Sequence, residues 1–412
     1  MITDTKIRAG LLGAKLSHSF SPQIHAELAD YPYDLVELAE NEIEPLLKSG
    51  KYDALNVTIP YKKTLIPFLA KITEEAKRVG AVNTVVRGAD GGWIGHNTDY
   101  AGFSDLVRSL GVCLTDKKVL VLGSGGASRT AVTVAEDMGA RAVVVISRNG
   151  EDNYENIDRH ADAEILINAT PVGMYPKNGE TPLSLDALPR LEAVFDMIYN
   201  PAKTKLLQDA ETRKIPNANG LLMLVSQARR AAEVFLDAKI ADEEVTRITN
   251  KIAKQMQNVV LIGMPGCGKS TLGKLLAAEM GRKFVDLDEE IVKRAGRPIP
   301  EIFATEGEET FRALETEVTA DICRESSLVI ATGGGVVTRE RNLPLLSQNG
   351  RVVFLDIHPA GLSTEGRPLS QKKSPEVLYA ERLPLYKKAA DVILPITRSV
   401  EENMQKLREA LL

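Results

Sequence analysis

The sequence predicts an α/β fold throughout, with mainly parallel sheets divided among roughly three compact units. Short runs rich in β-branched residues alternate with amphipathic helical stretches along the chain, which is the pattern of layered α/β proteins. The length of 412 residues exceeds one ordinary domain. Two glycine-rich turns, each between a predicted strand and a predicted helix, indicate nucleotide-type folds in the second and third units.

The order of the predicted elements separates the three units. The first has strands near 6–13, 53–58 and 81–86 and finishes around Asp99. The second opens with a strand at 119–122, a glycine-rich turn, a helix through Met138 and a strand at 142–146, and continues with strands at 163–168 and 193–196. Helices at 221–237 and 242–255 then lead, without a Gly/Ser spacer, into a strand at 259–263, which places the boundary near Met256.

Composition limits the classes of partner. Hydrophobic residues make up 44% and charged residues 26%, as in ordinary globular proteins, and the net charge of -5 gives no electrostatic reason to expect nucleic acid or an anionic membrane. The three cysteines, Cys113, Cys267 and Cys323, predict buried or half-buried thiols and neither a disulfide framework nor a zinc site. The first ten residues lack the apolar run of a signal peptide, so we expect a cytoplasmic protein with small-molecule partners.

A phosphate-binding loop opens the last third of the chain. Its sequence is Gly263-Met-Pro-Gly266-Cys267-Gly268-Lys269-Ser270-Thr271, after a strand and before an amphipathic stretch, which is the context this motif requires. The glycines let backbone N–H groups converge on phosphate oxygens at a helix N-terminus. We expect Lys269 to reach the terminal phosphates of ATP and the Ser270 hydroxyl to ligate Mg²⁺, and we assign this whole motif, Met and Pro apart, to nucleotide binding.

Two carboxylates follow the next predicted strand. Asp286 and Asp288 are two positions apart, so an extended chain would place both side chains on one side. Asp286 would then serve the magnesium shell, and Asp288 would orient the hydroxyl of a phosphoryl acceptor. Two solvated carboxylates at a strand end are the alternative interpretation.

Further motifs in this region carry a family resemblance. They are Asp286-Leu-Asp288, Phe311-Arg312, Gly333-Gly334-Gly335, Arg367-Pro-Leu and Arg382-Leu-Pro-Leu-Tyr386. In order and spacing they resemble shikimate kinases across residues 258–412, which implies a P-loop domain with a parallel sheet, similar to nucleoside monophosphate kinases. The resemblance implies that Arg312 and Arg382 clamp the substrate carboxylate, that the glycines bring amides against the ring hydroxyls, and that Arg367 is the lid arginine over the transferring phosphoryl group. The lid, between 361 and 373, looks shortened.

The second glycine-rich turn predicts a dinucleotide site. Gly123, Ser124, Gly125, Gly126 and Ala127 lie where a pyrophosphate would meet a helix N-terminus, although Ser128 replaces the usual third Gly or Ala. A turn that binds nothing is the alternative. The next strand ends at Ser147 and Arg148 without an acidic residue, which favours NADP over NAD because these side chains can hold a 2′-phosphate that a carboxylate would repel. Here an exposed arginine at a strand end is the alternative.

Motifs in the first two units resemble shikimate dehydrogenases over about residues 6–250. They are Ser17-His-Ser19-Phe-Ser21-Pro22, Asn56-Val-Thr58-Ile-Pro-Tyr-Lys62, Gly80-Ala-Val-Asn83-Thr, Asn97-Thr-Asp99, Asn168-Ala-Thr-Pro, Asp196-Met-Ile-Tyr199 and Gly220-Leu-Leu-Met-Leu-Val-Ser-Gln227. The resemblance implies that Ser19 and Ser21 hold a carboxylate, that Thr58, Asn83, Tyr199 and Gln227 contact the substrate, and that Gly220 belongs to the cofactor site. It implies that Lys62 and Asp99 do the proton chemistry of ketone reduction.

The two resemblances together predict domains and a function. We expect a substrate-binding domain at 1–100, to which 221–250 return, an NADP-binding Rossmann domain at 101–220, and a kinase domain at 257–412. The expected function is reduction of 3-dehydroshikimate with NADPH, followed by phosphorylation of shikimate with ATP and Mg²⁺. One alternative is a quinate-preferring, NAD-using dehydrogenase fused to a kinase for a related acid. The other is a sensor that binds the ring acid and a nucleotide without turnover.

Relatives commonly insert a helix in the short segment 149–167, so we expect the cofactor sheet to lack one covering helix.

Overall fold

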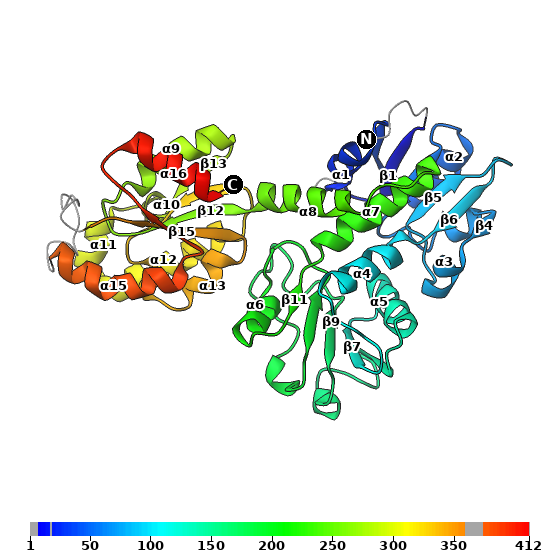
Figure 1. Ribbon diagram of the computed structural model, residues 1–412, viewed down its shortest axis with the longest axis horizontal. Helices are drawn as coiled ribbons and strands as arrows, with labels where there is room; N and C mark the ends of the chain where they lie inside the picture. The colour runs from blue at the N-terminus through cyan, green and yellow to red at the C-terminus, as the bar shows by residue number, and fades with distance from the viewer. Residues whose placement is uncertain (1–6, 17–18, 359–373, 412) are drawn as a thin grey trace. The chain divides into compact units, whose positions relative to one another are not determined.

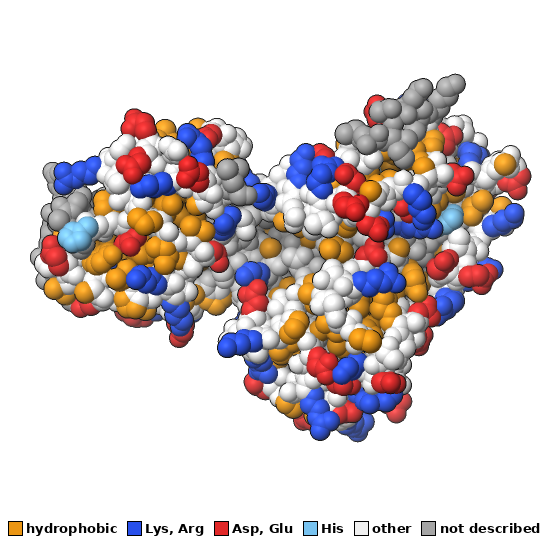
Figure 2. All heavy atoms as spheres, in the orientation of Figure 1, with side chains coloured by type: hydrophobic (Ala, Val, Ile, Leu, Met, Phe, Trp, Pro, Cys, Tyr) orange, Lys and Arg blue, Asp and Glu red, His pale blue; other side chains and the backbone are white. Residues whose placement is uncertain are grey.

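The computed structural model describes residues 7–16, 19–358 and 374–411 (Figure 1). The chain divides into two compact units: unit 1 consists of residues 1–173, 180–199 and 209–253, and unit 2 of residues 174–179, 200–208 and 254–412. Lys/Arg and Asp/Glu side chains are interspersed over the surface drawn in Figure 2. No helix within the described ranges has the length and apolar composition needed to cross a membrane.

Unit 1 begins with a six-stranded sheet in the order β2-β1-β3-β5-β6-β4. Its strands are β1 Ala9–Gly13, β2 Tyr33–Glu37, β3 Ala54–Val57, β4 Lys71–Ile72, β5 Thr84–Arg87 and β6 Trp93–His96. Its helices are α1 Ser21–Leu28, α2 Ile43–Lys48 and α3 Glu74–Val79, with 3-10 turns at Glu40–Glu42 and Ile66–Phe68. β1 pairs in parallel with β2 and β3, but β5 runs antiparallel to β3 and β6, so this sheet is mixed. The short turn 88–92 between β5 and β6 permits only a hairpin.

A second sheet in unit 1 is parallel and has the order β11-β10-β9-β7-β8. Its strands are β7 Lys118–Leu122, β8 Ala142–Ile146, β9 Ile165–Asn168, β10 Ala193–Asp196 and β11 Asn217–Ala218. The helices of this region are α4 Thr98–Ser109, α5 Gly126–Asp137, α6 Lys205–Thr212, α7 Leu221–Leu236 and α8 Glu243–Met256, with 3-10 turns at Ile157–His160 and Leu185–Ala187. Phe103 of α4 and Phe195 of β10 meet edge to face in its core.

The segment between β8 and β9, all of which the structure describes, contains the 3-10 turn Ile157–His160 and no α-helix. β8 is an edge strand of the sheet, and its central residues Val143, Val144 and Val145 are only half-buried. The expectation that this sheet lacks a covering helix agrees with the structure.

Unit 2 contains a parallel five-stranded sheet in the order β13-β14-β12-β15-β16. Its strands are β12 Asn258–Ile262, β13 Lys283–Asp286, β14 Leu328–Ala331, β15 Gly350–Asp356 and β16 Val392–Pro395. Its helices are α9 Lys269–Met280, α10 Leu287–Ala295, α11 Ile299–Thr305, α12 Gly307–Cys323, α13 Asn342–Ser347, α15 Pro375–Ala389 and α16 Val400–Leu411, with a 3-10 turn at Val336–Thr338. The central strand β12 ends at the phosphate loop, where ligands of open α/β sheets bind.

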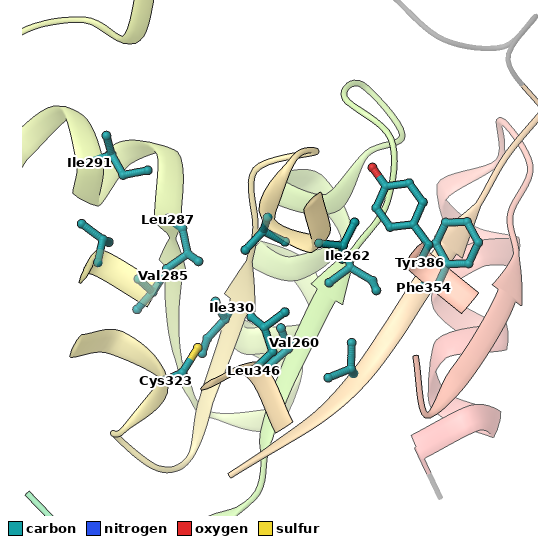
Figure 3. Close-up of a cluster of buried hydrophobic side chains, with 14 of the residues drawn as sticks. Val260, Ile262, Val285, Leu287, Ile291, Cys323, Ile330, Leu346, Phe354 and Tyr386 are labelled. Atoms are coloured by element: carbon teal, nitrogen blue, oxygen red, sulfur yellow. The ribbon is translucent and has the colours of Figure 1, made fainter. Parts of the chain in front are cut away.

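The core of unit 2 extends directly beneath this edge of the sheet (Figure 3). Tyr386 of α15 is fully buried and its ring stacks on Phe354 of β15, with 4.8 Å between the ring centroids. Its hydroxyl donates a hydrogen bond to the carbonyl of Gly334, and Arg382, one turn earlier on α15, donates to the same oxygen at 3.0 Å. The hydrophobic core therefore fixes the backbone of the Gly333–Gly335 run.

Two details differ from the sequence-based expectations. Asp288 does not extend a strand: β13 ends at Asp286, which caps α10 by accepting from the backbone N–H of Asp288 at 3.0 Å. A capping aspartate followed by acidic residues in the first turn favours a helix start over continued strand. Cys113 is exposed rather than buried, because it lies in the polar loop between α4 and β7, whereas Cys267 and Cys323 are buried.

Candidate active sites

Unit 1 contains a cleft of about 490 Å³ between its two sheets' helices and loops. Among the residues predicted for substrate binding and catalysis, those that line this cleft are Ser19, Ser21, Thr58, Lys62, Asn83, Asp99, Tyr199 and Gln227. Ala127 and Gly220, which were assigned to the cofactor, line it as well. Residues separated by more than 200 positions in the sequence thus share one cavity in this unit.

Lys62 and Asp99 form the charged centre of the cleft. The Lys62 ammonium lies 2.6 Å from a carboxylate oxygen of Asp99, and the two side chains are 28% and 17% exposed. Lys62 follows β3, and its carbonyl is held by the backbone N–H of Val82 at 2.8 Å. Asp99 lies in the first turn of α4, whose N-cap is Asn97. The backbone around each of the two residues is therefore held in place, and both side chains are exposed enough to contact a ligand.

Asn83 and Gln227 hold the start of α4 in place. Asn83 is buried, and its side-chain oxygen accepts from the backbone N–H of Thr98 at 2.7 Å. The Thr98 hydroxyl faces the side-chain oxygen of Gln227, on α7, at 3.5 Å. Because Thr98 directly precedes Asp99, these contacts also restrain the position of the Asp99 carboxylate.

The start of α1 also lines the cleft, through Ser19 and Ser21. The Ser19 hydroxyl accepts from the backbone N–H of Ser21 at 3.2 Å, and Ser21 is the first residue of the helix. Hydroxyl groups and helix N–H groups together suit a carboxylate. Burial raises the pKa of Tyr199 above its ordinary value, so its hydroxyl stays a neutral donor. The rest of the serine motif, residues 17 and 18, lies outside the described residues.

The glycine-rich turn after β7 has the features a dinucleotide needs. The N–H of Gly123 bonds to the carbonyl of Ile146, and α5 begins at Gly126 with Gly125 as its N-cap. A Cβ built at Gly125 or Gly126 would meet no atom within 4 Å, so a pyrophosphate has room against the backbone. Ser124 and Ala127 are exposed beside them. The Ser128 residue is only 2% exposed, so a serine fits between the helix and the sheet at this position.

Ser147 and Arg148 follow directly after β8, the strand beside β7. Arg148 is exposed and has no ion-pair partner within the described part of the chain. Ser147 is half-buried, and its N–H bonds to the carbonyl of Asp152 at 3.2 Å. An unpaired guanidinium here can bind a phosphate bidentately without first breaking another contact.

Unit 2 contains a second cleft, of about 410 Å³, at the carboxyl ends of its strands. The predicted residues that line it are Gly266, Gly268, Lys269, Ser270, Thr271, Asp286, Asp288, Arg312, Gly333, Gly334, Gly335 and Arg382. Gly263 and Cys267 lie in the same loop but face inward, because the carbonyl of Gly263 accepts from Lys269 and the Cys267 thiol is only 5% exposed. Arg367 lies outside the described residues.

The phosphate loop is preorganised for an anion. The Lys269 ammonium is buried and donates to the carbonyls of Gly263 at 2.9 Å and Met264 at 3.0 Å. Gly268, at φ 93°, has a left-handed conformation that favours glycine and turns the chain into α9. The Ser270 hydroxyl donates to Asp286 at 2.6 Å, so two oxygen groups that Mg²⁺ prefers already touch.

No group of three or more His, Cys, Asp and Glu side chains within the described ranges could hold a metal ion by itself. That is compatible with Mg²⁺ at a phosphate loop, because this ion is usually bound by one or two protein oxygens together with water and substrate phosphates. The Ser270–Asp286 pair meets this requirement, so the residues present fit both a nucleotide and its magnesium.

Two arginines, Arg312 and Arg382, and two carboxylates, Asp288 and Glu315, line the second cleft together with the phosphate loop. Arg312 donates to Glu315 at 2.7 Å, and both side chains are buried. Burial raises the pKa of the Glu315 carboxyl, although the neighbouring Arg312 opposes the shift. A Cβ at Gly335 would lie 2.2 Å from Arg312, and one at Gly333 would lie 2.8 Å from Asp288. Side chains at these two positions would therefore collide with Arg312 and Asp288 and displace them.

Asn56 and Glu315 are among the cleft residues that were not assigned a site role from the sequence. Asn56 lines the first cleft and is 5% exposed. It begins the motif that contains Thr58 and Lys62, but only those two residues were assigned a role. Glu315 lines the second cleft, three residues after Arg312 on α12. The signal for Glu315 was its i, i+3 spacing from an arginine already assigned to ligand binding, because such residues share one helix face.

Comparison with known protein families divides the chain in the same way as its sites. A family model for the shikimate dehydrogenase substrate binding domain matches residues 11–85, and a model for shikimate kinase matches residues 265–412. The shikimate dehydrogenase (NADP(+)) of Clostridium beijerinckii is 35% identical over 257 residues, which cover 58% of this chain and 94% of that relative. One from Alkaliphilus oremlandii is 34% identical over 270 residues and covers the same shares of the two chains.

Solved structures of shikimate dehydrogenases are similar to this chain as well. A chorismate mutase/shikimate 5-dehydrogenase fusion protein from Clostridium acetobutylicum has a TM-score of 0.57 at 33% identity, over 60% of this chain and 97% of the other. A shikimate 5-dehydrogenase from Thermus thermophilus, in complex with NADP(H) and shikimate, has a TM-score of 0.55 at 27% identity, over 60% of this chain and 99% of the other.

Proposed function

The chain belongs to the shikimate dehydrogenase family and ends in a shikimate kinase domain, and from this premise we infer that it is a bifunctional enzyme of the shikimate pathway. It reduces 3-dehydroshikimate to shikimate with NADPH and phosphorylates shikimate to shikimate 3-phosphate with ATP. The observation that carries this function is that each unit gathers its own family's motif residues in one cleft.

We assign the reduction to the cleft of unit 1. When bound, NADPH supplies the hydride and ATP supplies the phosphoryl group. The protein binds and orients the substrates and handles the protons. Ser19 and Ser21 would hold the substrate carboxylate, and the oxygen of the ketone that is reduced would then lie beside Lys62 and Asp99. There the Lys62 ammonium can donate a proton to the oxygen, and Asp99 can hold the ammonium in place, since the two already touch at 2.6 Å.

We assign the phosphorylation to the cleft of unit 2. Arg312 and Arg382 would grip the carboxylate of shikimate, and Asp288 would accept the hydrogen bond of the hydroxyl that is phosphorylated. Lys269 would leave the carbonyls of its own loop for phosphate oxygens, and Ser270 with Asp286 would hold magnesium. Arg367, as the lid arginine, is part of this proposal on the strength of its motif alone.

Domain limits, location and partners complete the proposal. We keep a substrate-binding domain at 1–100 with 221–250, an NADP domain at 101–220 and a kinase domain at 257–412. The partners are small-molecule substrates and nucleotides, with no nucleic acid or membrane involved. We propose that the protein works in the cytoplasm, which its three free thiols favour, since cytosolic thiols stay reduced.

One assay of products tests the proposed function. Purified protein is given 3-dehydroshikimate, NADPH, ATP and magnesium, and the products are separated by chromatography and identified by mass spectrometry. We expect shikimate 3-phosphate. Binding of both ligands without any product would favour the sensor, and a preference for quinate with NAD would favour the alternative dehydrogenase.

Arg148 gives a separate test of the cofactor preference. Arg148→Ala should raise the KM for NADPH by roughly 10- to 100-fold, because a hydrogen bond to a charged group contributes about 1.5–3 kcal/mol. The KM for NADH, which has no 2′-phosphate, should stay within about twofold. Arg141→Ala is the matched control: Arg141 is exposed just before the opposite end of β8, where its contact is Glu164. Equal effects of Arg148→Ala on both cofactors would contradict the assignment.

A further inference from the structure

A series of hydrogen bonds lies beneath the cleft of unit 1. The backbone N–H of Thr98 donates to the side-chain oxygen of Asn83 at 2.7 Å, and the hydroxyl of Thr84 donates to the same oxygen at 3.2 Å. The Asn56 amide nitrogen donates to the Thr84 hydroxyl at 3.0 Å, and the Tyr33 hydroxyl donates to the Asn56 side-chain oxygen at 2.7 Å. Asn83 and Asn56 line the cleft, whereas Tyr33 lies behind it on β2.

The direction of these hydrogen bonds follows from the first one. A backbone N–H can only donate, so the side-chain oxygen of Asn83 must face Thr98. A hydroxyl has one hydrogen, and that of Thr84 has acceptors in the Asn83 side-chain oxygen at 3.2 Å and the Thr98 hydroxyl at 3.1 Å, which leaves the Thr84 oxygen to accept from Asn56. The NH₂ group of Asn56 therefore faces Thr84, and its oxygen faces Tyr33, which donates.

The Tyr33 ring is held firmly in this position. The His25 imidazole stacks on it with 4.1 Å between centroids and 14° between planes, and Phe235 of α7 also stacks against His25, with 5.8 Å between centroids. Burial raises the pKa of the Tyr33 phenol well above its ordinary value, so the group stays a donor. Burial also lowers the pKa of His25 to about 3, so the stacked imidazole is neutral.

We propose that Tyr33 is a positioning residue for the dehydrogenase substrate, acting through Asn56. By occupying the Asn56 oxygen, Tyr33 makes the amide present an N–H to the cleft and keeps its carbonyl turned away. A ligand oxygen that can only accept, such as a keto or carboxylate oxygen, can bond to an N–H but is repelled by a carbonyl oxygen. This inference rests on the proposed function of the cleft, and it makes a residue outside the cleft part of substrate recognition.

The test is the steady-state KM of Tyr33→Phe, which keeps the stacked ring and removes only the hydroxyl. The KM for 3-dehydroshikimate should rise roughly 5- to 20-fold, the effect of about one lost hydrogen bond and a misoriented amide. The kcat and the KM for NADPH should stay within about twofold. Tyr31→Phe is the matched control, because the Tyr31 hydroxyl belongs to the same aromatic cluster but bonds to His25 and not to Asn56. This control should leave the KM for 3-dehydroshikimate unchanged.

A double-mutant cycle separates action through Asn56 from a general loss of structure. In an Asn56→Ala background, Tyr33→Phe should have no further effect on the KM for 3-dehydroshikimate. An undiminished effect in that background, or equal KM values for Tyr33→Phe and Tyr31→Phe, would overturn the inference. If Asn56→Ala does not fold, as judged by circular dichroism, the comparison of the two Phe variants decides alone. A wild-type protein that does not reduce 3-dehydroshikimate would instead contradict the proposed function.

Discussion

Lys62→Ala should lower kcat/KM for the reduction of 3-dehydroshikimate by about 10²- to 10⁴-fold, the range expected when a positioned proton donor is lost. The Lys62 ammonium touches Asp99 and is still 28% exposed to the cleft, so it can reach a substrate oxygen without leaving the carboxylate. Without it, the carboxylate of Asp99 would stand unpaired where negative charge develops on the keto oxygen during hydride transfer. The two negative charges would repel, so the loss should appear mainly in kcat. NADPH consumption at saturating cofactor measures it.

The same chain supplies two controls for this experiment. Lys63→Ala removes an exposed ammonium from the neighbouring residue and should leave reduction within about twofold of the wild type, as expected of a surface substitution. Phosphorylation of added shikimate, measured on the Lys62→Ala preparation itself, should be unchanged, because Lys62 belongs to unit 1. The assignment fails if Lys62→Ala keeps more than about a tenth of the wild-type kcat/KM, the smaller end of general-acid effects being about 10².

The features that sequence alone predicted well are those set by local patterns. The strands at 142–146 and 193–196 have the predicted bounds, since short apolar runs limited by turn residues are local signals. Both glycine-rich turns lie between a strand and a helix, as predicted, because the turn, the helix start and the ligand site share a few consecutive residues. The α/β class with parallel sheets is confirmed for the sheets of β7 and β12.

Features that depend on tertiary contacts were harder to predict. The antiparallel β5 could not be read from its own residues, because its direction follows from the tight turn into β6. Asp288 was placed on a strand because alternation was assumed to continue, whereas capping by Asp286 began a helix. Tyr33 carries no motif at all: its importance comes from meeting Asn56, 23 positions away, inside the fold.

Lys269→Ala should abolish most of the second reaction and none of the first. We expect phosphorylation of shikimate to fall by about 10²- to 10³-fold, the effect of removing one preorganised charged donor from a developing anion. Reduction of 3-dehydroshikimate should be unchanged, since Lys269 lies in unit 2, so shikimate should accumulate when all substrates are present. Lys274→Ala is the control, because its ammonium lies one turn further along α9 and is 60% exposed.

A structural effect of this substitution must be separated from the loss of charge at the phosphates. Lys269 caps the carbonyls of Gly263 and Met264, so its removal leaves two buried acceptors with one partner fewer and destabilises the loop. Lys269→Met keeps most of the side-chain volume and removes only the ammonium. If the charge acts on the transferring group, both variants should lose turnover while still binding MgADP, seen as a nucleotide-dependent rise in the thermal unfolding midpoint. If the loop has instead collapsed, MgADP should no longer raise that midpoint, and the role of Lys269 in phosphoryl transfer would have to be withdrawn.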